Sequence, residues 1–183
     1  MAPHALALCC VLVLAAAEGP AGVNDDIFAA VRRDDVAAID RLCGADAALL
    51  DAPGPGGQTP TMHGVLQGKA KAVEKLIALG ADLTLPEKDG YTPMHGAAFQ
   101  GRALVANILA DAGVSVNDVH SDGYTPVQRA CWGTQQRHAA TVAAMLARGA
   151  ALADKAACRA AVDGSNKWTA EVVAAHFLGK AEL

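Results

Sequence analysis

The sequence predicts an all-α solenoid in which short pairs of helices stack one on another. The first observation is a tetrapeptide, Gly-X-Thr-Pro, that occurs three times at a spacing of 33 residues, beginning at Gly57, Gly90 and Gly123. The second is that each Thr-Pro pair precedes a stretch with helical apolar periodicity. The third is a composition with 52% hydrophobic but only 4% aromatic residues, which suits helices packed through small side chains. A fixed period of this length is typical of a repeat array.

The tetrapeptide predicts where each unit begins its first helix. Thr59, Thr92 and Thr125 are each expected to be an N-cap, because a threonine hydroxyl can accept a hydrogen bond from an unpaired helix N–H. The proline that follows suits the first helical position, where its missing donor costs nothing. The glycine that precedes can adopt a positive φ and so closes a tight turn.

The apolar periodicity predicts a second helix in each unit. Its buried face consists of Val73, Leu76 and Ile77 in the first copy, Val105, Ile108 and Leu109 in the second, and Val142, Met145 and Leu146 in the third. Gly80, Gly113 and Gly149 follow these faces and are expected to end the helices. The small pairs Ala97–Ala98 and Ala130–Cys131 allow neighbouring helices to approach closely. One unit cannot bury its apolar face alone, so the units must stack.

The middle copy carries a resemblance to a known family. Residues 89–98 read Asp-Gly-Tyr-Thr-Pro-Met-His-Gly-Ala-Ala, which resembles the ankyrin repeat, a β-turn followed by Thr-Pro-Leu-His-X-Ala and two helices. The resemblance spans residues 24–180 and is strongest over 56–121. Two copies depart from it, since His63 is displaced by one place and Val127-Gln128 replaces Leu-His. The resemblance implies that His95 is structural and bonds to a neighbouring turn.

We therefore predict about four to five units, counting degenerate caps at both ends. The predicted segments are a leader at 1–22, an N-terminal capping repeat at 23–55, repeats at 56–88, 89–121 and 122–154, and an irregular C-terminal segment with a capping helix at 155–183.

The two caps lack the full motif. The N-terminal cap keeps helical patterns at 27–31 and 36–43. In the C-terminal cap, Thr169 is expected to be the N-cap of the last helix. Because Thr169 follows Thr125 by 44 residues, extra residues must lie between them. We place about three at 134–138 and the rest in a long loop at 150–167 with a helical turn at 155–161.

The two ends of the chain predict the compartment. Ala5 to Ala17 is an apolar run without charge, too short to span a bilayer, which takes about 20 residues, but typical of a signal peptide cleaved near Ala17. The chain ends Lys-Ala-Glu-Leu, which resembles the Lys-Asp-Glu-Leu retrieval signal. We expect entry into the secretory pathway and retention in the endoplasmic reticulum lumen. Secretion, a plastid-directed presequence and a cytoplasmic protein with an alanine-rich leader are the alternatives.

The sequence contains little that indicates catalysis. It has no phosphate-binding loop, no metal-ligand cluster and no nucleophile motif, so we expect no catalytic residue, metal or cofactor. Cys43, Cys131 and Cys158 are interpreted as small buried hydrophobes. The enzymatic alternative is a thiol-dependent or redox protein that uses Cys131 or Cys158 with a histidine such as His138. A net charge of −4 and the lack of a basic run argue against nucleic acid or an anionic membrane as a partner.

The predicted function is non-catalytic binding of a protein partner through a concave face. In ankyrin repeats, ligands are held by the turns and the first helices, and aromatic side chains cluster at those positions here. The predicted binding residues are Gln58, Lys88, Tyr91, Phe99, Gln100, Ser121, Tyr124 and Trp132. Tyrosine and tryptophan are enriched at binding hot spots. Two alternatives remain open: the aromatics pack between turns, or the chain has no specific partner. The partner and the oligomeric state do not follow from the sequence.

Overall fold

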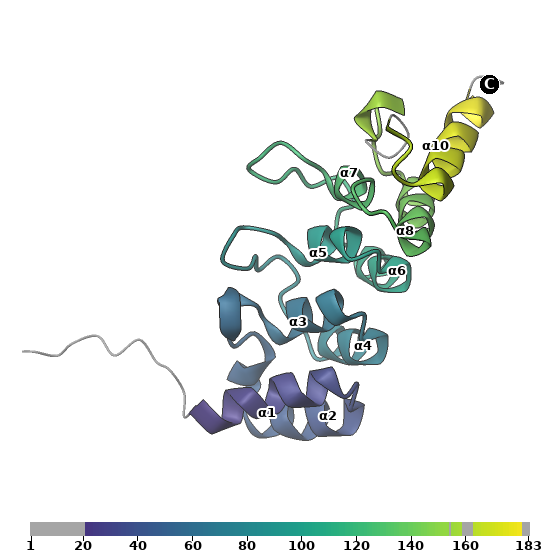
Figure 1. Ribbon diagram of the computed structural model, residues 1–183. Coiled ribbons are helices and arrows are strands. Elements are labelled where there is room, and N and C mark those ends of the chain that lie inside the picture. Colours follow the sequence, from purple (N-terminus) through teal and green to yellow (C-terminus); the bar gives the residue numbers. More distant parts are fainter. Residues whose placement is uncertain (1–20, 154, 159–162, 181–183) are drawn as a thin grey trace, which may run out of the picture.

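The computed structural model describes residues 21–153, 155–158 and 163–180. Pairs of helices stack along one axis, and hairpin turns project from one side of the stack (Figure 1). The elements in chain order are α1 (Ala21–Arg32), α2 (Val36–Ala45), η1 (Ala47–Leu50), η2 (Pro55–Gly57), α3 (Pro60–Gln67), α4 (Ala70–Ala78), α5 (Pro93–Phe99), α6 (Ala103–Asp111), α7 (Pro126–Ala130), α8 (Gln136–Ala147), η3 (Lys155–Ala157) and α10 (Lys167–Lys180). The prediction of an all-helical repeat solenoid is confirmed.

The helices form two layers. The inner layer is α1, α3, α5 and α7, each packed on the next. The outer layer is α2, α4, α6 and α8, and α10 closes it by packing on α8 (Figure 1). Because the main contacts of each described helix are with its neighbours in the stack, the array can present a long surface made of corresponding residues from successive units.

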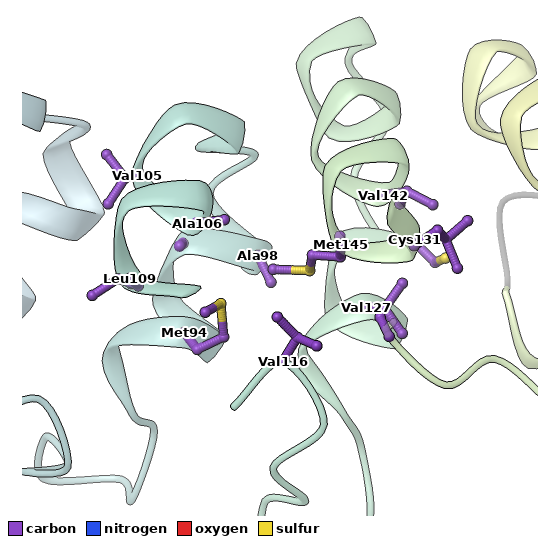
Figure 2. Packing of buried hydrophobic residues seen from close by; sticks show 14 of the residues in the cluster. Met94, Ala98, Val105, Ala106, Leu109, Val116, Val127, Cys131, Val142 and Met145 are labelled. Carbon is purple, nitrogen blue, oxygen red and sulfur yellow. The ribbon is translucent and has the colours of Figure 1, made fainter. Parts of the chain in front are cut away.

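The buried side chains form two clusters. The larger runs from α3 to α10 and includes Met94, Leu109 and Val127, none of which is exposed to solvent (Figure 2). The smaller joins α1 and α2 to α4 through Ile39 and Leu76. The small residues of the inner layer are also buried, as expected, and Ala97 and Ala98 have no exposed surface. Their size lets α5 approach both neighbouring inner helices closely.

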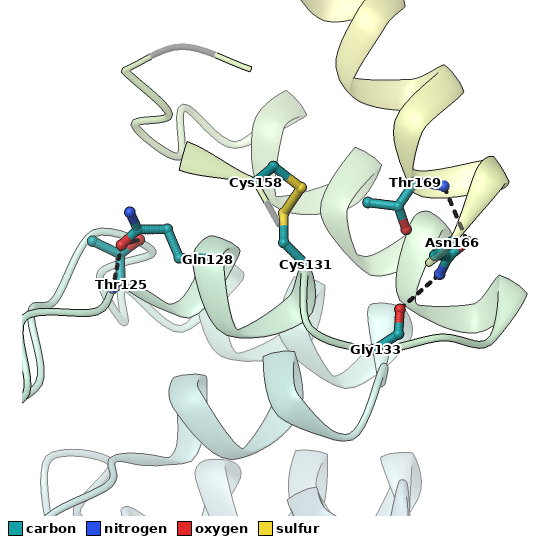
Figure 3. Close-up of a disulfide and its surroundings, with 7 residues drawn as sticks. All are labelled: Thr125, Gln128, Cys131, Gly133, Cys158, Asn166 and Thr169. Carbon is teal, nitrogen blue, oxygen red and sulfur yellow. Dashed lines mark hydrogen bonds between the residues drawn. A yellow bond between two sulfur atoms is a disulfide. The ribbon is translucent and has the colours of Figure 1, made fainter. Parts of the chain in front are cut away.

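The predicted helix starts are correct in position. Thr59 caps as expected, accepting a bond from the Met62 N–H at 3.2 Å, and Thr125 forms a capping box with Gln128. The hydroxyl of Thr92 instead contacts His95 Nδ1 at 2.8 Å. Thr125 donates from both its N–H and its hydroxyl to Gln128 Oε1, at 2.9 and 3.1 Å (Figure 3). In both of these units, the side chain of the third helical residue, His95 or Gln128, bonds to the threonine hydroxyl.

The prediction for the last helix is wrong in one detail. Thr169 is not the N-cap of α10, because the Asn166 side chain accepts from the Thr169 N–H at 3.2 Å (Figure 3). The extra residues near 134–138 lengthen the outer helix, since α8 has 12 residues and α6 has 9. The helical turn expected at 155–161 is the short η3, and residues 159–162 lie outside the described part of the chain.

Candidate functional site on the inner face

Three hairpin turns, which we call the fingers, border the inner layer. Each is closed by two backbone hydrogen bonds in corresponding places, Gly54 N–H to Gln58 O, Glu87 N–H to Tyr91 O and His120 N–H to Tyr124 O among them. The predicted positive φ occurs in each finger, at Gly57, Gly90 and Gly123. The fingers are also tied to one another, since the Lys88 N–H donates to Gly56 O at 3.0 Å and His120 Nε2 lies 3.0 Å from Asp89 O. They therefore form one continuous border.

Aromatic rings link the second and third fingers. Tyr91 stacks on His120 with centroids 3.9 Å apart and an interplanar angle of 18°. Tyr124 meets Trp132 edge to face at 4.9 Å. These two pairs flank a side chain that the sequence analysis did not select, Arg129 of α7.

Arg129 is only 6% exposed, and its guanidinium lies over three rings. The guanidinium carbon is 4.9 Å from the centroid of Tyr91, 5.2 Å from that of Tyr124 and 4.3 Å from that of Trp132. One nitrogen donates to the Tyr91 hydroxyl at 3.0 Å and is paired with Asp122. Its Nε is buried and has no hydrogen-bond partner among the described residues. A buried cation is tolerated here because its charge is balanced by the carboxylate and the ring faces.

Asp122 is correspondingly held in its ionised form. Desolvation raises the pKa of this carboxyl, but hydrogen bonds from His120, the Tyr124 N–H and Arg129 outweigh that effect and lower it to about 2. The contact between His120 and Asp122 has the opposite effect on the pKa of the His120 imidazole. The side-chain hydrogen bond to Asp122, followed by the backbone of Asp89, raises the pKa of His120.

His95 lies beneath the fingers and is 2% exposed. Its pKa is lowered chiefly because burial disfavours the charged ring, an effect that the backbone of Tyr124 partly offsets. Nδ1 contacts Thr92, whereas Nε2 is buried and makes no hydrogen bond of normal geometry. The ring thus bonds to Thr92 of its own turn and also interacts with the backbone of the next turn at Tyr124.

These residues surround a depression of about 270 Å³, which we call the inner hollow. Its walls are apolar on the α3 side, where Met62 and Leu66 lie, and polar on the finger side. The lining consists of Met62, Leu66, Glu87, Tyr91, His95, Gly96, Phe99, Gln100 and Arg129. Gly96 contributes to its size, because a β-carbon there would lie 3.1 Å from Met62 Sδ and 3.2 Å from Leu66 Cδ2. The hollow lies between successive units and exists only in the stacked array.

The predicted binding residues are distributed along this face. Tyr91, Phe99 and Gln100 line the hollow, and Tyr124 and Trp132 flank Arg129. The other three lie on the fingers or at their base. Gln58 Oε1 is 3.4 Å from His63 Nδ1, Lys88 is exposed on the second finger, and Ser121 is exposed beside His120. Whether these residues bind a partner stays a prediction.

Sequence reasoning missed Arg129, although a signal was present. Positions 63, 96 and 129 correspond at the period of 33 and hold histidine, glycine and arginine. The helical spacing also places Arg129 on the inner helix between two residues that had been selected, Tyr124 and Trp132.

The cysteines differ from the interpretation made from sequence. Cys131 and Cys158 are both buried, but they form a disulfide and are not separate apolar side chains (Figure 3). Cys43 is free and buried, as expected. The pairing was missed because the cysteines are 27 residues apart and joined across an irregular segment. In this form neither residue offers a thiolate nucleophile.

His138 does not form the thiol–imidazole pair considered above. Its Nδ1 is 3.2 Å from Gln135 O and its Nε2 is 3.2 Å from Phe99 O, so both ring nitrogens face carbonyl oxygens. Within the described ranges, no group of three or more histidine, cysteine or acidic side chains could hold a metal ion. The same residues contain no helix that is long and apolar enough to cross a membrane.

The fold and the fingers define a helical repeat protein. A family model described as ankyrin repeats (3 copies) matches residues 27–120 and 62–156, and the chain belongs to this family. A search of curated proteins gave no match. Ankyrin repeats are generally protein–protein interaction modules and are typically not enzymes.

Proposed function

We propose that this protein binds a protein partner through the inner face, with the inner hollow as the central contact. The supporting observation is that the hollow is lined by the buried Arg129, whose Nε has no hydrogen-bond partner among the described residues. An unpaired buried polar group is costly, and a ligand that supplies the missing partner recovers that cost. No catalytic step is proposed for the site.

The hollow specifies the chemistry of the contact. Its volume of about 270 Å³ lies below the range of about 300–1,000 Å³ typical of sites for small organic ligands. It therefore suits one large side chain of a partner. Met62, Leu66 and the half-exposed Phe99 favour an apolar side chain. Arg129 favours a hydrogen-bond acceptor, such as a carbonyl or carboxylate, beside it.

Site-specific photocrosslinking tests this proposal. A photoreactive phenylalanine analogue would replace Phe99, which is 54% exposed and lines the hollow, or Leu104, which is 64% exposed and lies on α6. We expect a discrete adduct with a protein from the Phe99 position and none from Leu104. Binding of the protein so identified should weaken at least about 10-fold in Phe99→Ala, because a hot-spot side chain contributes about 2 kcal/mol or more. Leu104→Ala serves as the matched control.

Two outcomes would count against the inner face. Equal adducts from both positions would mean that contact is not confined to the hollow. Absence of adducts from either position in the correct compartment would favour the alternative that the chain has no specific partner.

We further propose that the protein works in the secretory pathway. The support is the Cys131–Cys158 disulfide, since structural disulfides persist in oxidising compartments and are rare in the cytosol. The apolar leader at 5–17 and the last three residues of the C-terminal Lys-Ala-Glu-Leu lie outside the described residues, and the roles of both segments stay predictions.

Imaging tests the compartment. A fluorescent domain inserted between Gly19 and Pro20 leaves both chain ends native and precedes α1. The matched chain would end at Glu182. Reticular signal that becomes secreted when Leu183 is removed would support a lumenal resident. Diffuse cytosolic signal from both chains would overturn the secretory proposal and leave the inner-face proposal unaffected.

A further inference from the structure

The loops that join inner to outer helices lie at the edge of the stack opposite the fingers. Each carries at least one basic residue although the sequence contains no basic run. We call this row the basic edge, and its members are Arg32 and Arg33 at the end of α1, Lys69 and Lys71 around the start of α4, Arg102 before α6, Arg137 at the start of α8 and Lys167 at the start of α10.

Contacts between loops show that the basic side chains are neighbours in space. Arg102 donates to Leu66 O of the preceding unit at 3.2 and 3.1 Å, and its side chain packs on Gly68. Arg137 packs in the same way on Gly101, where a β-carbon would lie 2.8 Å from its Cγ. Burial and then the charge of Arg137 lower the pKa of Arg102, which is the expected effect of a nearby like charge.

The last member belongs to the same row. Asn166, directly before Lys167, donates to Gly133 O at 2.8 Å and to Gln135 O at 3.0 Å, in the loop that leads to Arg137. The row therefore runs the length of the array, from α1 to α10. Lys167 is exposed, and its ammonium lies 5.1 Å from the Trp168 ring.

The charges of the basic edge are not neutralised within the described chain. In the described part of the chain, the lysines and arginines that form ion pairs are Lys75 with Asp40, Arg129 with Asp122 and Arg148 with Asp111. None of these is on the basic edge. The acids in its loops are Asp34, Asp35 and Asp163, which accept backbone N–H groups from Ala72, Ala38 and Ser165 respectively. The loops at 66–71, 99–104 and 132–138 contain no acid.

The finger side of the molecule has the opposite charge. Its turns carry the acidic residues Asp51, Asp82, Glu87, Asp89, Asp118 and Asp122, with Lys88 and Arg148 as basic exceptions. The molecule, with a net charge of −4, thus separates its charges across its width. A large polyanion such as a nucleic acid or an anionic bilayer would meet this overall negative charge, whereas a narrow ligand can contact the basic edge alone.

We propose that the basic edge binds an extended acidic peptide segment of a partner protein. Packed helices lie about 8–10 Å apart, and an extended chain rises about 3.3 Å per residue. An acidic residue at every third position would therefore meet one basic residue in each successive unit. Nucleic acid is a poorer match, since duplex DNA carries a charge about every 1.7 Å. The proposal concerns a different surface from the inner face and is independent of it.

Fluorescence anisotropy with defined probes tests this proposal on the purified protein. The probe is a fluorescein-labelled peptide of five Glu-Gly-Ser units, compared with a peptide of the same composition in which the glutamates are contiguous. The test variant is Lys69→Gln with Arg137→Gln. The matched control is Arg41→Gln with Arg148→Gln, which changes the net charge equally but lies off the basic edge. Circular dichroism melts establish that both variants are folded.

We expect the spaced peptide to bind more tightly than the contiguous one and its affinity to fall with added salt. The edge variant should weaken binding about threefold to tenfold, which is about 0.3–0.7 kcal/mol for each of two exposed ion pairs. The control pair should change it less than about twofold. Equal weakening in both variants, or no binding of the spaced peptide, would overturn the proposal. Tighter binding of a single-stranded oligothymidylate or of phosphatidylserine vesicles, lost in the edge variant, would also overturn it.

Discussion

Arg129 is the residue on which the inner face depends most. Its guanidinium lies over Tyr91, Tyr124 and Trp132 and is paired with Asp122. Replacing it with alanine removes both the charge and the packing of its stem. We expect Arg129→Ala to lower the free energy of unfolding by about 2–4 kcal/mol, as measured by urea titration.

Arg129→Met separates the two contributions. Methionine refills the volume and leaves Asp122 to solvent, so we expect it to recover most of the lost stability. It should not recover partner binding, because it cannot donate a hydrogen bond into the hollow. Equal losses of stability in the two variants would show that the charge, not the packing, is what stabilises the fold.

Two histidines on the inner face should respond to pH in opposite directions. The folded pKa of His95 is lowered, so the unfolded state binds more protons as pH falls through about 6.5, and stability is lost. The folded pKa of His120 is raised, so its contribution is complete below about pH 6.5 and is lost as pH rises through the folded value. We expect melting temperature to fall less from about pH 7.5 to about pH 5.5 in His95→Gln than in the wild type, and more in His120→Gln.

His63, which is half-buried, contributes to the pH dependence of the wild type and of both variants. Burial and then the charge of Arg32 lower the pKa of His63, so it adds to the acid-side loss of stability in all three proteins. Identical slopes for the wild type and both variants would contradict the assignment.

Among the elements, α10 depends on a single asparagine. Asn166 is 1% exposed, caps α10 through its carbonyl oxygen and donates to two carbonyls of the preceding loop. We expect Asn166→Ala to cost about 2 kcal/mol in urea unfolding followed by tryptophan fluorescence. Asn166→Asp keeps the cap acceptor but not the donors, so it should not restore stability. Restoration by aspartate would mean that capping alone matters.

What the sequence could predict about these elements depended on local chemistry. Gly57, Gly90 and Gly123 adopt the positive φ expected of them, and Thr59 caps its helix, because these features are set within one turn. The sequence did not predict that Asn166, and not Thr169, caps α10, because Asn166 is held in place by carbonyl oxygens 31 and 33 residues away.

The same distinction applies to the candidate site. The aromatic positions could be selected from the repeat period, and they do lie on one face. The role of Arg129 and the Cys131–Cys158 disulfide could not be predicted from the repeat period, because each depends on contacts between units. The basic edge was not predicted from the sequence for the same reason. Its residues are about one repeat apart in the sequence and become neighbours only when the units stack.

For the whole molecule, the division of the core into two clusters predicts uneven unfolding. Ile39 is fully buried in the N-terminal cluster, whereas both tryptophans, Trp132 and Trp168, lie toward the other end. We expect Ile39→Ala, a loss of about 2–4 kcal/mol, to shift the circular dichroism transition in urea while leaving the fluorescence midpoint nearly unchanged. The wild type, measured by both signals, is the control. Equal shifts would show that the array unfolds as one unit.

The disulfide also determines how the molecule would carry a mechanical load. A force applied between the two ends passes from Cys158 directly to Cys131 and bypasses the 27-residue interval between them. That interval corresponds to about 90 Å of extended chain. An oxidised molecule pulled in an optical trap should therefore release about 90 Å less length on complete unfolding than a reduced one. Its inner helix α7 would stay tethered to the C-terminal segment after the N-terminal units have extended.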